Sequence, residues 1–112
     1  MTEQTLAPEA PLVVMVTAPS AEKASEIARV LVEERLAACA NLVGPIRSIY
    51  RWQGKVEDEA EVLLLLKTRV EVFERLRERV VGLHEYSCPE VVALPIVRGH
   101  EPYLQWLGES VG

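Results

Sequence analysis

The segment Glu61 to Lys67 contains four consecutive leucines, and it constrains the fold of this chain more than any other feature. It follows the turn-like sequence Gln53-Gly54-Lys55, and the alternating segment 46–52 precedes that turn. Two such segments joined by a short glycine-containing turn predict an antiparallel β-hairpin. Side chains of a strand alternate between the two faces of a sheet, so both faces of the second strand are apolar. One face carries Leu63 and Leu65, and the other carries Val62, Leu64 and Leu66.

Both apolar faces of this strand need cover from water. An antiparallel strand in a small domain normally packs one face on the core and exposes the other. A chain of 112 residues has material for one helical layer and little for a second. We therefore expect Val62, Leu64 and Leu66 to be covered by other copies of the chain. Edge-to-edge pairing of the hairpins would hold the same homo-oligomer together.

Composition and charge indicate one globular domain and exclude some partners. Apolar residues make up 49% of the chain, and the net charge is -5. Nucleic acids and anionic membranes are bound by clustered Lys and Arg, so we expect neither as a partner. Residues 1–11 lack the pattern of a secretory signal, and no apolar run reaches the roughly 20 residues that span a bilayer. We predict a flexible tail over residues 1–11, a single domain over residues 12–112, and a cytoplasmic protein with two free cysteines.

The periodicity of the chain predicts the order strand, helix, strand, strand, helix, strand, helix. Ser20 is expected to cap the first helix, Gly44-Pro45 to interrupt the first hairpin strand, and Thr68 and Glu71 to form a capping box. The predicted elements are strand 12–17, a helix to about residue 38, extended chain 39–52, strand 61–67, a helix from 68 to 82–84, edge strand 91–97 and helix 102–109. This order is the split βαβ pattern of a ferredoxin-like α+β sandwich, with two helices on one face of an antiparallel sheet.

Five sequence motifs together resemble the CutA family of divalent-cation tolerance proteins, and they cover about residues 12–110. The motifs are Glu34-Arg35-Leu36-Ala37-Ala38-Cys39-Ala40-Asn41, Ser48-x-Tyr50-x-Trp52-x-Gly54, Glu61 through Lys67-Thr68, His84-x-Tyr86-x-x-Pro89-Glu90 and Tyr103-Leu104-x-Trp106. The resemblance implies a ferredoxin-like subunit with a long hairpin and a C-terminal helix, in a tight homotrimer similar to the PII signalling proteins. It also implies a function in tolerance of, or response to, divalent metal ions, copper in particular.

Cysteine and histidine side chains are the candidate metal ligands. Copper binds thiolate and imidazole, so Cys39 and His84 are chemically suitable ligands. No Cys-x-x-Cys or His-x-x-x-His pair occurs, which argues against a closed site in one chain. We predict weak binding of copper or another divalent cation, completed across subunits and not required for folding. The alternative is structural, with Cys39 as a small buried hydrophobe and His84 as a helix-terminal residue favoured by the dipole.

The acidic residues Glu57, Asp58, Glu59 and Glu61 allow two interpretations. Carboxylates bind hard cations, but these lack the spacing and glycine of a calcium loop. The solvated tip of a hairpin is therefore the preferred interpretation. Glu61 and Lys67 lie at the two ends of the apolar strand, where a polar side chain needs a partner. We predict that both residues have a role between subunits or in a pocket.

The aromatic residues Tyr50, Trp52, Tyr86, Tyr103 and Trp106 suit a subunit interface, where large amphipathic rings concentrate. Lining of a pocket is the alternative for these residues and for Glu90. The chain has no nucleophile motif, phosphate-binding glycine loop or dinucleotide fingerprint, so we expect no enzyme and no catalytic residue.

Two other functions remain as alternatives. One is a PII-like signalling protein that binds a small metabolite in the clefts between subunits and transmits that state to a partner protein. The other is an enzyme that acts through Glu90, Tyr86 and His84.

Overall fold

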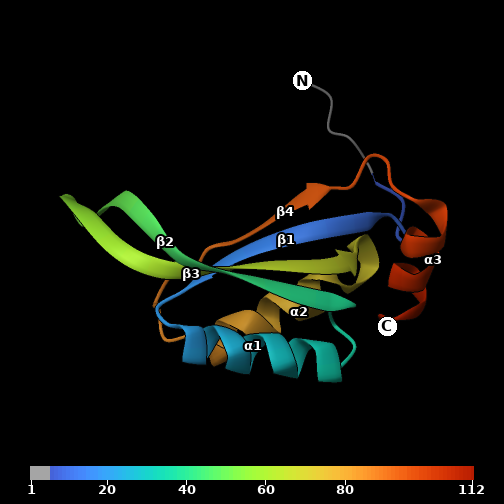
Figure 1. The fold of residues 1–112 in the computed structure, drawn as a ribbon, viewed down its shortest axis with the longest axis horizontal. Coiled ribbons are helices and arrows are strands. Elements are labelled where there is room, and N and C mark those ends of the chain that lie inside the picture. The colour runs from blue at the N-terminus through green and yellow to red at the C-terminus, as the bar shows by residue number, and fades with distance from the viewer. Residues whose placement is uncertain (1–5) are drawn as a thin grey trace.

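The computed structural model describes residues 6–112, which form one antiparallel sheet and three helices (Figure 1). The strand order in the sheet is β2-β3-β1-β4. In Figure 1, α1 and α2 lie on one side of the sheet, and α3 lies beside one end of it. The elements are β1 (Pro11–Ala18), α1 (Ala21–Glu33), β2 (Cys39–Trp52), β3 (Lys55–Arg69), α2 (Val70–Leu83), β4 (Val91–Pro95) and α3 (Glu101–Glu109). The predicted element order and α+β class are confirmed.

The core lies between the sheet and the two long helices. Alternate residues of β1 and β3 point into it, and Ile27, Leu31 and Leu76 of the helices fill the opposite side. The expectation that Val62, Leu64 and Leu66 lack cover within one chain is wrong, because they are 9%, 0% and 0% exposed. The two faces of the strand are equally apolar, so the sequence could not show which one the helices cover.

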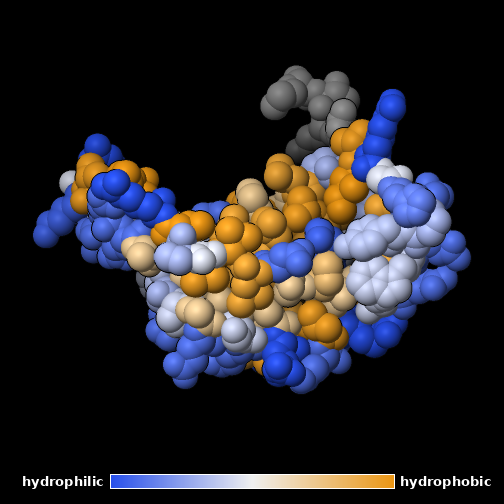
Figure 2. All heavy atoms as spheres, in the orientation of Figure 1, coloured by the Kyte–Doolittle hydropathy of each residue, from blue (hydrophilic) through white to orange (hydrophobic). Residues whose placement is uncertain are grey.

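The other face of the sheet carries the alternate residues of each strand, and no helix within residues 6–112 covers it. We call it the open face, formed by Val13, Met15, Leu63, Leu65, Val92 and Leu94. Val92 and Leu94 of the edge strand β4 are exposed, and the other four are half-buried. Figure 2 shows apolar surface gathered over the sheet between the hairpin tip and α3.

The hairpin of β2 and β3 projects beyond the rest of the sheet (Figure 1). Its turn consists of Gln53 and Gly54, whose φ angles of 51° and 79° match the hairpin turn that favours glycine. The strand register shifts between Val43 and Ile46, which confirms the interruption predicted at Gly44-Pro45. The acidic residues 57–59 belong to β3 near this tip, so β3 is longer than predicted.

Helix α1 begins as predicted, but it ends five residues early. The Ser20 hydroxyl accepts a hydrogen bond from the Lys23 backbone N–H at 3.1 Å. The helix ends at Glu33, and Arg35 adopts a φ of 61°. The chain then turns inward and buries residues 36–38, an apolar run that resembled a continued helix in sequence.

The predicted capping box of Thr68 and Glu71 is wrong. The Thr68 hydroxyl donates to the Leu36 carbonyl at 2.8 Å, and Arg69 occupies the N-cap position of α2. The first N–H groups of α2 instead donate to backbone carbonyls, from Val70 to Ala10 at 3.0 Å and from Glu71 to Pro8 at 2.9 Å. Part of the predicted tail is therefore attached to the start of α2, and residues 1–5 lie outside the described part. No helix within residues 6–112 is long and apolar enough to cross a membrane.

Candidate functional site: a cavity beside the hairpin

A cavity of about 600 Å³ lies between the hairpin and the loop that follows α2. Five predicted interface or cleft residues from three separate segments of the chain line this cavity together: Tyr50, Trp52, Glu61, Tyr86 and Glu90. The other lining residues are Thr17, Arg47, Ser48, Ile49, Ser87 and Cys88. We call this space the hairpin cavity.

A buried carboxylate and a phenol form the polar centre of the hairpin cavity. Glu61 lies in β3 just beyond the residues that pair with β1, and it is 6% exposed. The Tyr86 hydroxyl donates a hydrogen bond of 2.7 Å to Glu61 Oε2. Burial, followed by this hydrogen bond and the charge of Glu61, raises the pKa of Tyr86 far above its usual value of 10.0. Tyr86 is therefore a neutral donor at physiological pH.

His84 is held by hydrogen bonds at both ring nitrogens. Its Nε2 lies 2.7 Å from the Thr17 carbonyl, to which it donates, and its Nδ1 accepts from the Tyr86 backbone N–H at 3.1 Å. This pair of contacts is the pattern of a neutral imidazole with the proton on Nε2. In this arrangement His84 positions Tyr86, and neither nitrogen is free to bind a metal ion.

The hairpin side of the cavity carries two further polar pairs. The Arg47 guanidinium binds both oxygens of Asp58, at 2.8 Å through Nε and at 2.6 Å through Nη2. The same guanidinium lowers the pKa of Asp58. Tyr50 donates to Glu59 at 3.2 Å. Asp58 and Glu59 are exposed, as expected for the solvated tip of a hairpin, whereas Glu61 is buried.

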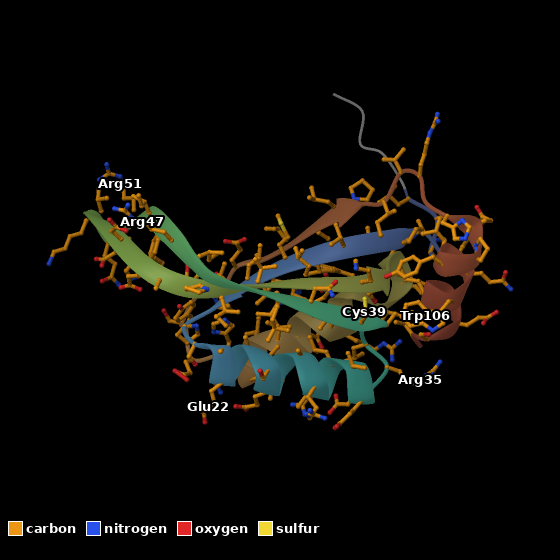
Figure 3. The ribbon with its side chains drawn as sticks, in the orientation of Figure 1. Glu22, Arg35, Cys39, Arg47, Arg51 and Trp106 are labelled. Carbon is orange, nitrogen blue, oxygen red and sulfur yellow. The ribbon has the colours of Figure 1, made fainter. Side chains whose placement is uncertain are left out.

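The remaining predicted residues gather at the opposite end of the sheet, next to α3. This sheet-end cluster consists of Cys39, Asn41, Lys67, Tyr103 and Trp106, of which Figure 3 labels Cys39 and Trp106. Lys67 Nζ donates to Asn41 Oδ1 at 3.1 Å and lies 3.6 Å from Cys39 Sγ. Tyr103 also lies 3.6 Å from Cys39 Sγ, and this contact, with burial, raises the Tyr103 pKa.

The structure does not bring Cys39 and His84 together within one chain. Cys39 lies opposite Lys67, which pairs with Val13, whereas His84 contacts Thr17. Val13 and Thr17 are about 13 Å apart along β1, and one metal ion binds ligands about 2 Å away. Within residues 6–112, no group of three or more His, Cys, Asp or Glu side chains could hold a metal ion.

Sequence reasoning missed Arg47 and Cys88 as residues of the hairpin cavity. Arg47 lies on the face of β2 opposite to Tyr50 and Trp52, yet all three residues line the same cavity. Alternation alone would separate them, so no sequence signal marked Arg47. Cys88 lies in the loop after α2, whose path depends on His84 and Tyr86.

Comparison with known proteins identifies the family. The family model described as CutA1 divalent ion tolerance protein matches residues 12–110. The divalent-cation tolerance protein CutA of Thermus thermophilus is 56% identical over 100 residues, which are 89% of this chain and 97% of that protein. The human protein CutA is 49% identical over 92 residues, which are 82% of this chain and 51% of that protein. The chain thus spans about half the length of that relative.

Solved structures agree with these sequence matches. A crystal structure of CutA1 from Oryza sativa has a TM-score of 0.89 and 46% sequence identity, over 92% of this chain and 94% of that chain. The structure named periplasmic divalent cation tolerance protein CutA from Archaeoglobus fulgidus has a TM-score of 0.88 and 41% sequence identity. The match covers 91% of this chain and 99% of that chain. The family model and these relatives cover nearly the whole described sheet and all three helices. The chain belongs to the CutA1 divalent ion tolerance protein family.

Proposed function

We propose that this chain acts in divalent-cation tolerance as a homotrimer of PII-like architecture, built from ferredoxin-like subunits. The protein responds to divalent metal by binding rather than by catalysis, and it acts in the cytoplasm. The apolar open face is the observation that supports self-association. This face presents six apolar side chains from three strands, and burial of one such side chain contributes roughly 1.5 to 3 kcal/mol.

Metal binding in this proposal is weak and needs more than one subunit. Cys39 and His84 are too far apart in one chain to share an ion, so a site that uses them takes ligands from different copies. To release a ring nitrogen, His84 must give up one of its two hydrogen bonds. This cost favours an open, exchangeable site over a tight one, and it leaves folding independent of metal.

The direct test measures native mass and metal uptake on protein stripped of metal. Light scattering should give three times the mass of the chain at micromolar concentration, and a folded monomer would overturn the assembly. Copper, zinc and cobalt titrations should show copper uptake that Cys39→Ser and His84→Ala each reduce at least tenfold. Cys88→Ser and His100→Ala change the other cysteine and the other histidine, so they are matched controls. Equal uptake by all four variants would remove Cys39 and His84 from the site.

The hairpin cavity favours a second function, which is binding of a small molecule. Its volume of about 600 Å³ lies within the range of small-molecule sites. Several aromatic rings and a buried carboxylate converge on it, as in such sites. Catalysis has less support, because both nitrogens of His84 are engaged and Tyr86 keeps its proton. A general base near neutral pH needs a free site for a proton.

A further inference from the structure

We propose that the hairpin cavity binds an organic cation, such as a primary alkylammonium group, with the Glu61 carboxylate as its counterion. This inference deepens the second candidate function and rests on it. It names the chemical class of the ligand and the residue that recognises its charge.

The Glu61 carboxylate has an oxygen available for a ligand. Tyr86 donates to Oε2, and no other described residue donates a hydrogen bond to either oxygen. No Lys or Arg of residues 6–112 forms an ion pair with Glu61. A buried carboxylate with one neutral donor and no cation is poorly compensated. A bound ammonium group supplies the missing positive charge and up to three N–H donors.

The charge around the cavity also favours a cation. Glu61 and Glu90 line the cavity. Burial is the main cause of the raised pKa of Tyr50, and the nearby carboxylates of Glu59 and Glu57 raise it further. Among the described residues of the lining, Arg47 is the one that is basic, and its guanidinium is already paired with both carboxylate oxygens of Asp58. An anionic ligand would therefore meet net negative charge and no free guanidinium.

Aromatic rings supply the rest of a cation site. Tyr50, Trp52 and Tyr86 line the cavity with Glu61. The face of an aromatic ring attracts an organic cation, most strongly for Trp, and it also packs against an alkyl chain. A divalent metal ion instead needs several oxygen, nitrogen or sulfur ligands at short distance. No described cluster of three such side chains is present here.

The test uses n-butylammonium, n-butanol and butyrate, which share their alkyl chain and differ in charge. The Trp52 indole and the Tyr86 amide report binding in ¹H–¹⁵N spectra of the native assembly at constant ionic strength. We expect saturable shifts with n-butylammonium, and at least tenfold weaker binding of n-butanol and butyrate. This comparison uses the unmodified protein, so it does not depend on the folding of any variant.

Variants then assign the charge recognition to one residue. Glu61→Gln keeps the shape and should weaken n-butylammonium binding at least tenfold. Glu101→Gln removes the same charge at the exposed start of α3 and should leave binding unchanged. Equal binding by both variants, or tighter binding of butyrate or n-butanol, would overturn the cationic ligand and leave the cavity as a small-molecule site.

Two further outcomes would also overturn the inference. If none of the three probes moves the reporter signals, the small-molecule function fails as well. If zinc shifts them in a way that depends on Glu61 and n-butylammonium does not, the cavity is a metal site. The trimer and the role of Cys39 are decided separately, by native mass and by copper titration.

Discussion

The hydrogen bond from Tyr86 to Glu61 links the two halves of the hairpin cavity. It joins β3 to the loop after α2, and the acceptor is a carboxylate that is 6% exposed. His84 fixes the position of that loop by accepting from the Tyr86 backbone N–H. A hydrogen bond to a largely buried charge contributes more than one at the surface, because the carboxylate loses a donor that bulk water replaces less easily.

Tyr86→Phe should lower the free energy of unfolding by about 1.5 to 3 kcal/mol, because it removes the one donor to this buried carboxylate among residues 6–112. Tyr50→Phe is a matched control, since Tyr50 donates to the exposed Glu59. We expect the control to change stability by about 0.5 kcal/mol or less. Urea unfolding at neutral pH measures both. Equal losses in the two variants would contradict a special role for the Glu61 contact.

Alkaline pH gives an independent check on Tyr86. Burial and Glu61 raise its pKa above the value of 10.0 expected in the unfolded chain. Below about pH 10 the phenol is protonated in both states, so it causes no pH dependence. Above that pH the unfolded chain loses the proton first, and stability falls. Tyr86→Phe should therefore show a shallower loss of stability between about pH 9 and about pH 11. Parallel profiles for the two proteins would show that the Tyr86 pKa is not raised.

The two long helices begin in different ways. Helix α1 starts with the side-chain cap that its sequence predicts, whereas α2 starts on backbone carbonyls of residues 8–10. The N-terminal N–H groups of a helix need acceptors, and backbone carbonyls can serve as acceptors as well as side chains. Thr68 instead ties the end of β3 to the chain that leaves α1.

Ser20→Ala should lower the free energy of unfolding by about 1 kcal/mol, because it removes the acceptor for the Lys23 N–H. Ser25→Ala changes an exposed serine in the middle of the same helix and is the control. Alanine is the better helix former there, so the control should be unchanged or slightly more stable. Thermal unfolding followed by circular dichroism measures both variants. Comparable destabilisation at the two positions would contradict the cap.

The molecule as a whole has one covered and one uncovered side. The helices cover one face of the sheet, and the open face presents an apolar surface to its surroundings (Figure 2). Large apolar patches on a folded chain are typical of contact with other molecules. The proposed trimer places this face between subunits.

Leu94→Lys should shift the native mass from trimer toward monomer, because a charge on the open face opposes burial between subunits. Leu94 is 49% exposed in one chain, so the monomer can still fold. Val81→Lys is the matched control, since Val81 is 45% exposed and lies on α2. Sedimentation should show a full trimer for this control. A trimer of unchanged stability for Leu94→Lys would place the interface elsewhere.

Sequence reasoning selected seven interface or cleft residues, and the structure divides them between the hairpin cavity and the sheet-end cluster, which contains Lys67 and Trp106. It selected Tyr50, Trp52, Glu61, Tyr86 and Glu90 as interface or cleft residues, and all five line one cavity. It proposed Cys39 and His84 as metal ligands in a site completed across subunits, and within one chain the structure places them at different ends of the sheet. Chemistry limits which residues can bind a metal ion, but distance decides which of them can bind the same ion.

The sequence by itself determined the element order, the α+β class, the cap of α1 and the register break in β2. Each of these depends on local periodicity or on one residue with a strong backbone preference. Tertiary structure alone decided which face of β3 enters the core, where α1 ends, what caps α2 and which side chains meet in the hairpin cavity. These outcomes depend on packing between segments far apart in the chain. Both faces of β3 are apolar, so the local sequence does not show which face is buried. The packing of the helices decides it.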